Sequence, residues 1–280
     1  MTDYSLTADL HTHTNFSDGA YSVEEVVAKV AAAGITTLSI TDHDTVEGLH
    51  RAVTICREYS VDLIPGIEIT TALGNVQLHI LGYFIDFSDA NFQRQLTALR
   101  EGRLKRAQRI ITKLNKIKIP INLDRVVERA GEKKSIGRPH IADLLVLEGY
   151  ANNYQEAFDK YLGIGRPAYE RNHPFSPDSA INMISTAGGL SFLAHPSHYI
   201  SEGVLMKLIK SGLNGIEVIH PSHSEHEMDK WRKLASNNSL LISGGSDFHG
   251  GKRSDEENLG KFFVGVDVVN TMKKKLNIAA

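Results

Sequence analysis

Cysteine is almost absent from this sequence, since Cys56 is the one thiol in 280 residues. A single thiol excludes an internal disulfide framework, and its position in an apolar, helix-like stretch predicts a buried thiol and not a nucleophile. An excess of charge is also lacking, because 31 Lys and Arg stand against 33 Asp and Glu, for a formal net charge of −2. No global field favours nucleic acid or a membrane, so recognition of a polyanion has to be local.

Long apolar runs are missing as well. No stretch approaches the roughly 18 apolar residues of a membrane span, and the N-terminus has no cationic region followed by an apolar one. These absences predict a soluble, cytoplasmic protein. The length of 280 residues and a hydrophobic content of 41% suffice for a large core and for an enzyme.

Short apolar runs alternate with amphipathic stretches near both ends of the chain. The runs predict seven strands, at residues 5–10, 36–41, 61–70, 75–83, 189–196, 214–221 and 240–250. Ser22 and Glu25 form a capping box for one intervening helix, and Ser176 with Pro177 begins another. Strands separated by helices predict an α/β fold with a mostly parallel sheet, closed into a barrel.

The alternation stops in the middle of the chain, where only helical periodicity is present. This stretch predicts a small helical domain inserted into the barrel. The predicted division is residues 1–89 for the first barrel segment, 90–175 for the helical insertion and 176–280 for the second barrel segment.

Histidines and carboxylates gather at the predicted strand ends. In DLHTHTNFSDG, residues 9–19, His11 and His13 point to the same side because they are two positions apart in a strand, and Asp18 follows closely. A pair of histidines at this spacing, taken alone, belongs more often to a polar loop than to a metal site. Further residues of these types lie in or after the other predicted strands: His43, Glu68, His79, His195, Asp247 and His249. Because the loops after barrel strands converge on one face, we expect one cluster there.

This set of six histidines and three carboxylates is too large for one ion. Mixed imidazole and carboxylate ligands suit Zn, Mn or Fe better than Ca or Mg, and the lack of cysteine ligands argues against a closed structural zinc site. The Glu68 carboxylate can bridge two cations. Open sites of this type activate water and clamp phosphoryl oxygens, so the pattern favours hydrolysis of a phosphate ester.

Some assignments have a plain alternative. His79 lies among apolar residues, and alone it is more often a hydrogen-bonded core histidine. Asp42 and Asp44 flank His43, and we expect one to orient an imidazole and the other to belong to a turn or cap. His50 and His226 are expected on solvated helix faces. Whether the following histidines bind metal stays undecided: His173, His198, His220, His223 and His226.

Taken together, DLHTHTNFSDG, TDHD, the strand of Glu68, AHP and SDFH resemble the PHP family, the polymerase and histidinol phosphatase superfamily of metal-dependent phosphoesterases. The resemblance implies a distorted (β/α)7 barrel with a three-metal site. The implied ligand sets are His11, His13, Glu68 and Asp247 for one metal, Glu68, His79 and His195 for a second, and Asp18, His43 and His249 for a third. The expected cofactors are two to three divalent ions, namely Mn, Zn or Fe.

The insertion narrows this resemblance. With IGRPHIA, residues 136–142, it looks like the subgroup of nucleoside 3′,5′-bisphosphate phosphatases and 5′-to-3′ exoribonucleases acting on short RNA. The resemblance implies that Arg138 and His140 contact a substrate phosphate. Lys133 and Lys134 add positive charge beside His140, so we expect Lys134 to bind the substrate as well. The alternative for Arg138 is a surface charge at a helix start, because Pro139 suits a first helical turn.

The leading hypothesis is a hydrolase that removes phosphate from a nucleotide or from the 5′ end of a short oligonucleotide. It expects a small nucleotide or short RNA as partner, no membrane and no obligatory protein partner. His195 and His223 are the candidates for protonating the leaving group. A histidinol phosphatase shares the metals and is the first alternative. The second is a metal-binding module without turnover, against which the complete ligand set counts.

Overall fold

The computed structural model describes residues 6–74, 76–130, 135–171, 175–196, 200–253 and 255–279. Lys133 and Lys134 therefore lie outside the described residues, as do His173 and His198. None of the described helices combines the length and the apolar character needed to cross a bilayer.

The elements follow one another in three groups. The first contains β1 (Thr7–Thr12), α1 (Val23–Ala32), β2 (Thr37–Ile40), α2 (Glu47–Glu58), β3 (Asp62–Leu73) and β4 (Val76–Tyr83). The second contains α3 (Ala90–Lys116), α4 (Leu123–Ala130), α5 (Arg138–Leu147), α6 (Tyr154–Ala157) and the π-helix η1 (Phe158–Leu162). The third contains α7 (Pro177–Thr186), β5 (Leu190–Leu193), α8 (Glu202–Lys210), β6 (Gly215–Ile219), α9 (Glu225–Asn237), β7 (Leu241–Gly244), the 3-10 turns η2 (Gly251–Arg253) and η3 (Glu256–Asn258), β8 (Val264–Gly265) and α10 (Val266–Lys275).

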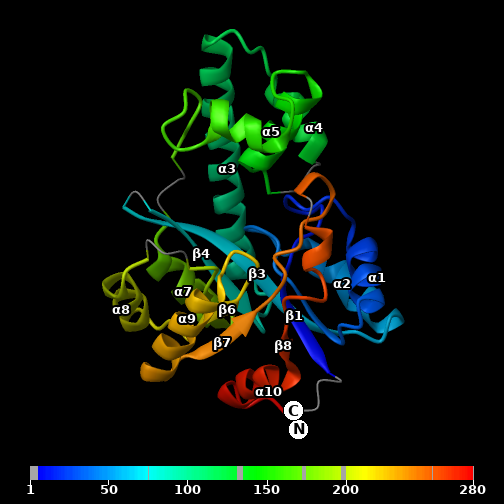
Figure 1. Cartoon of the computed structure of the whole chain (residues 1–280), viewed down its shortest axis with the longest axis vertical. Helices are drawn as coiled ribbons and strands as arrows, with labels where there is room; N and C mark the ends of the chain where they lie inside the picture. The colour runs from blue at the N-terminus through cyan, green and yellow to red at the C-terminus, as the bar shows by residue number, and fades with distance from the viewer. Residues whose placement is uncertain are drawn as a thin grey trace.

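The strands form one mixed sheet in the order β7-β6-β5-β4-β3-β2-β1-β8, which curls into a nearly closed barrel (Figure 1). The open seam is bridged where Thr12 pairs with Phe248, and the His13 amide donates to the Phe248 carbonyl at 2.8 Å. The predicted barrel is confirmed. Beyond the seven predicted strands the structure adds the two-residue β8, antiparallel to β1.

Strand β4 departs from the expected parallel arrangement, because it pairs antiparallel with both β3 and β5. The physical reason is the short connection. Only two residues separate Leu73 from Val76, and Gly74 there adopts a φ of +60°. A parallel return needs a dozen or more residues, so the chain can only fold back as a hairpin. As a result Glu68 lies within a long β3 and not at its end.

Local signals account for several helix starts. The Ser22 and Glu25 capping box of α1 is present, with both side-chain to backbone hydrogen bonds formed. The Ser176 side chain accepts from the Ser179 amide at the start of α7, with Pro177 in the first turn. These polar caps satisfy amide groups that have no partner within the helix.

The floor of the barrel is apolar. Because alternate strand residues share a face, Leu81 and Tyr83 lie on the same side of β4 as His79. Both are fully buried, and the Tyr83 ring meets Phe192 of β5 edge to face at 5.0 Å between centroids. Any polar cluster above this floor is shielded from water on one side.

The long helix α3 belongs to two apolar cores. Phe92 and Leu96 in its first turns pack into the barrel core, whereas Ile110 and Leu114 pack with α4, α5 and η1 into a separate core. Figure 1 shows α3 rising past the barrel, with α4 and α5 beside its far half. The division of the chain at residues 90 and 175 stays a prediction, and the second core supports it.

Candidate metal centre

Strand β1 aims a row of polar side chains at one point. Asp9 and His11 alternate along it, His13 follows directly after its end, and all three are fully buried. The Asp9 carboxylate accepts from the Ser246 hydroxyl at 2.6 Å and from the Ser246 amide at 3.0 Å, which ties β1 to the loop after β7. The Nε2 atoms of His11 and His13 lie 3.1 Å apart. Two imidazoles aimed at each other in this way suit a shared cation.

Glu68 is the centre of the cluster, with 1% of its surface exposed. Its Oε1 lies 2.6 Å from His79 Nδ1 and 2.9 Å from His195 Nε2. The other oxygen, Oε2, faces three more imidazoles at 3.2 to 3.3 Å, those of His11, His13 and His43. Burial alone would raise the pKa of Glu68, but the surrounding imidazoles hold it well below its usual range. The carboxylate is therefore anionic and sits where it can bridge two cations.

A second carboxylate, Asp18, lies beside the Glu68 cluster and shares two of its imidazoles, those of His13 and His43. Asp18 Oδ1 lies 3.4 Å from His249 Nε2 and 3.9 Å from His13 Nδ1, and Asp18 Oδ2 lies 3.9 Å from His43 Nε2. Burial would raise the pKa of Asp18, but Arg253, His249 and His43 keep it well below its usual range. We call His13, Asp18, His43 and His249 the Asp18 corner.

Several buried nitrogen and oxygen atoms that could bind a metal have no hydrogen-bond partner, which indicates a cation site. Within the described part of the chain, these atoms include His13 Nδ1, Asp18 Oδ1, His43 Nδ1 and His249 Nε2. Leaving such atoms unsatisfied costs about 1–3 kcal/mol each, so a native structure supplies them with partners. Groups of donors lie within 4.8 Å of one another around His11, His13, Glu68 and Asp247, around the Asp18 corner, and around His43, Glu68 and His79. The residues present therefore fit bound metal ions.

Two of the predicted ligands adopt unusual backbone conformations. His195 has a φ of +24° and Asp247 a φ of +50°, in the left-handed region that non-glycine residues rarely adopt. The His195 amide donates to Glu217 Oε2 at 2.7 Å, which holds its loop in place. Backbone strain of this kind persists where surrounding contacts over-determine it, and such positions cluster at functional sites.

Glu217 and His220 extend the predicted set. Glu217 of β6 is fully buried and accepts from His11 Nδ1 at 2.8 Å, which orients that imidazole. His220 Nε2 lies 3.3 Å from Asp247 Oδ2. Sequence reasoning missed Glu217 and left His220 undecided. The available signal was a glutamate in the otherwise apolar run GIEVI.

The two aspartates that flank His43 both bind groups other than an imidazole. Asp42 accepts from the Thr14 amide and hydroxyl at 2.8 and 2.6 Å and from the Ser17 hydroxyl at 2.5 Å, so it braces the loop after β1. Asp44 accepts from the Thr70 amide at 2.8 Å and pairs with Arg103 of α3. The expectation that one of them orients an imidazole is wrong, because both carboxylates are turned to these other donors.

The predicted substrate contacts lie at the insertion. Arg138 lines a cavity of about 230 Å³ together with His79 and His195. Its guanidinium lies 5.6 Å from the Phe158 ring centroid and 6.0 Å from that of Tyr169. His140 is turned elsewhere, since its Nε2 contacts the Ser17 carbonyl at 2.8 Å and its Nδ1 accepts from the Gly137 amide at 3.0 Å.

The second candidate for leaving-group protonation lies between two backbone carbonyls, and its neutral ring can donate to one of them. His223 Nδ1 lies 2.8 Å from the Val218 carbonyl and Nε2 lies 3.1 Å from the Pro196 carbonyl. Burial lowers the pKa of His223. His195, by contrast, lines the cavity that Arg138 shares, so of the two candidates it is the one placed beside that cavity.

Comparison with known proteins agrees with this geometry. The PHP domain family matches residues 9–156. A 3′,5′-nucleoside bisphosphate phosphatase of Chromobacterium violaceum is 33% identical over 246 residues, covering 86% of each chain. A 5′-3′ exoribonuclease of Escherichia coli is 34% identical over 255 residues, covering 89% of this chain and 87% of the relative. A solved structure from Bifidobacterium adolescentis, described as a metal-dependent phosphoesterase, superposes with a TM-score of 0.90 at 30% identity, covering 97% and 96%.

The protein is a metal-dependent phosphoesterase, a hydrolase of phosphate esters. This class follows from the nearly closed barrel, from the adjoining imidazole and carboxylate clusters, and from these relatives. The chain belongs to the PHP domain family.

Proposed function

We propose that this enzyme hydrolyses nucleotides that carry a second phosphate, either nucleoside 3′,5′-bisphosphates or 5′-phosphorylated short oligoribonucleotides. The observation that carries the proposal is the cavity that Arg138 lines together with His79 and His195. Among the described residues, no carboxylate pairs with Arg138, whose recorded contacts are the Leu162 carbonyl at 3.3 Å and two aromatic rings. A partly buried guanidinium without an acidic partner is suited to a phosphate, which it can hold with two parallel hydrogen bonds.

The relatives support the same substrate class, because their names include a nucleoside bisphosphate phosphatase and a 5′-3′ exoribonuclease. A substrate with two phosphates can place one at the clusters around Glu68 and the other at Arg138. A simple monoester offers nothing to Arg138. The contact of Arg138 with a second phosphate would therefore distinguish bisphosphates and short RNA from simple monoesters.

The proposed metal ligands are the nine predicted residues: His11, His13, Asp18, His43, Glu68, His79, His195, Asp247 and His249. Two to three bound divalent ions, Mn, Zn or Fe, would supply an activated water and neutralise the charge on the phosphoryl oxygens. Glu68 Oε2 and Asp247 Oδ1 each lie 3.2 to 3.3 Å from the Nε2 atoms of His11 and His13. His195 Nε2 contacts Glu68 and the residue also lines the Arg138 cavity, so it would protonate a leaving group only in a state in which it is not bound to metal.

The test compares substrates with one and two phosphates on matched variants. Losing a charge-assisted contact costs roughly 1.5–3 kcal/mol, so Arg138→Ala should lower kcat/KM for a bisphosphate or short RNA by about 10- to 150-fold. Hydrolysis of an aryl monophosphate should stay nearly unchanged. Arg166→Ala, at an exposed position of the same insertion, is the control and should alter neither reaction.

Two results would contradict the proposal. Equal losses on both substrates in Arg138→Ala would show that Arg138 supports the fold or the metal centre and not substrate choice. Histidinol phosphate as the best wild-type substrate would show that the nucleotide assignment is wrong.

A further inference from the structure

The insertion reaches all three loops that form the Asp18 corner. Its Ser135 amide donates to the Phe16 carbonyl at 3.1 Å, and His140 contacts the Ser17 carbonyl, next to Asp18. Arg103 of α3 pairs with Asp44, next to His43. In the loop of His249, the Arg253 guanidinium lies 5.6 Å from the ring of Tyr154 in α6.

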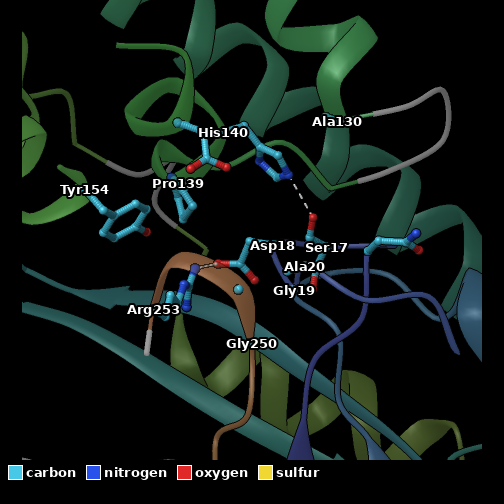
Figure 2. A pocket seen from close by; sticks show the side chains of 13 residues that line it. Ser17, Asp18, Gly19, Ala20, Ala130, Pro139, His140, Tyr154, Gly250 and Arg253 are labelled. Atoms are coloured by element: carbon cyan, nitrogen blue, oxygen red, sulfur yellow. Dashed lines mark hydrogen bonds and ion pairs between the residues drawn. The ribbon is translucent and has the colours of Figure 1, made fainter. Parts of the chain in front are cut away.

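His140 is held in one tautomer by its two contacts. The Gly137 amide donates to Nδ1 at 3.0 Å, so Nδ1 carries no hydrogen and Nε2 carries the proton. Nε2 therefore donates to the Ser17 carbonyl at 2.8 Å, the dashed contact across the pocket in Figure 2. With 8% of its surface exposed and both nitrogens engaged, His140 can act on the metal centre only through the backbone of Ser17.

Arg253 fixes the other side of Asp18. Its Nη2 donates to Asp18 Oδ2 at 2.6 Å, a contact drawn in Figure 2. Both residues line a cavity of about 490 Å³, together with His140 and Tyr154 of the insertion. This contact occupies one carboxylate oxygen and leaves Oδ1 facing His249 Nε2. Asp18 is thus oriented as a donor with one oxygen available.

The barrel holds the same loop from below. Asp42 accepts from Thr14 and Ser17, and a side chain at Gly19 would place its Cβ 2.6 Å from the His13 carbonyl oxygen. We therefore expect the loop to keep its overall path when one contact from the insertion is removed. What such a removal alters is the fine position of Asp18, on which a metal ligand depends.

We propose that the helical insertion completes the metal centre, with His140 as the positioning residue that places Asp18 for the ion held by Asp18, His43 and His249. The inference rests on the metal-binding part of the proposed function and needs no particular substrate. It gives His140 a role at the metal centre in place of the phosphate contact expected from the sequence. Contacts to groups that orient ligands change metal affinity by about 10- to 100-fold when they are removed.

A matched pair of substitutions separates the two contacts of His140. In His140→Asn the amide oxygen can replace Nδ1 toward Gly137, but the side chain is too short to reach Ser17. In His140→Gln the amide nitrogen takes the place of Nε2 and can still donate to the Ser17 carbonyl. The measurement is Mn²⁺ titration of the metal-free full-length protein, with free Mn²⁺ followed by electron paramagnetic resonance and no substrate present.

We expect the wild type to bind Mn²⁺ at three sites. In His140→Asn the Mn²⁺ affinity of one site alone should fall by about 10- to 100-fold, and in His140→Gln that affinity should be close to the wild-type value. Urea unfolding of each variant confirms that it is folded, and Tyr154→Leu, which removes the ring beneath Arg253, should weaken the same site. Wild-type affinities in His140→Asn, equal losses in the Asn and Gln variants, or weakening of all sites together would overturn the proposal. A wild type with fewer than three sites would also overturn it, whereas failure of the nucleotide assay alone would not.

Discussion

Replacing Glu68 by Gln is the most direct test of the metal centre. The substitution keeps the shape of the side chain and removes one buried negative charge. That charge lies 2.6 to 3.3 Å from five imidazole nitrogens, with 1% of the side chain exposed. Removing one partner of a buried, hydrogen-bonded charge pair costs about 3–5 kcal/mol.

That cost concerns folding. For metal affinity, removing a group that only orients a ligand costs about 10- to 100-fold, and Glu68 is itself a proposed ligand, so the loss should be at least about 100-fold. We therefore expect Glu68→Gln to bind Mn²⁺ at least about 100-fold more weakly and to lose kcat/KM by a comparable factor. The assays are metal content after dialysis, by mass spectrometry, and phosphate release from a nucleoside bisphosphate.

Two control variants calibrate the result. Glu217→Gln removes a carboxylate that binds His11 Nδ1 and orients its ring. The loss of Mn²⁺ affinity in this variant should therefore be smaller, about 10- to 100-fold. Glu58→Gln changes an exposed glutamate at the end of α2 and should behave as the wild type. Wild-type metal content and rate in Glu68→Gln would refute the assignment of Glu68 as the bridge between the clusters.

Three further predictions concern the whole protein. Removing metals with a chelator should abolish hydrolysis, and adding back Mn²⁺ should restore it; full activity of metal-free protein would contradict the proposed function. Burial lowers the pKa of His140, so the unfolded chain binds more protons than the folded one, and stability is lost as pH falls below about 6.5. Urea unfolding of metal-free protein between pH 7 and 5 should show this loss, and His140→Gln should reduce its slope by up to about 1.4 kcal/mol per pH unit; an unchanged slope would show that the imidazole titrates normally. Burial raises the pKa of the Cys56 thiol to about 11, so a thiol reagent at pH 8 should modify it only after unfolding, and rapid labelling of the folded protein would contradict this burial.

The strand-end pattern was sufficient to predict that these histidines and carboxylates gather. His11 and His13 share a face because strands alternate with a period of two, and the loops after successive strands converge in a barrel. The Ser22 and Glu25 capping box was predictable for a similar reason, since its partners are three residues apart. Interactions between near neighbours depend on spacing, and spacing can be read directly from the chain.

Contacts between distant segments were not predictable in this way. The ion pair of Arg253 with Asp18 joins positions 235 apart, and the contact of His140 with the Ser17 carbonyl joins positions 123 apart. The orientation of His11 by Glu217 spans 206 positions. A local pattern names a residue type but not the direction in which its side chain points once distant elements pack together.

By itself, the sequence determined the residue types of the centre, the alternation that turns His11 and His13 to one side, and the absence of a disulfide framework. Only the tertiary structure decided that β4 runs antiparallel, that Asp42 braces a loop while Glu217 orients an imidazole, and that His140 faces Ser17. The reason is physical: periodicity and capping depend on residues within a few positions of each other. The choice of partner for a buried carboxylate or imidazole depends on which donors the folded chain brings within about 3 Å.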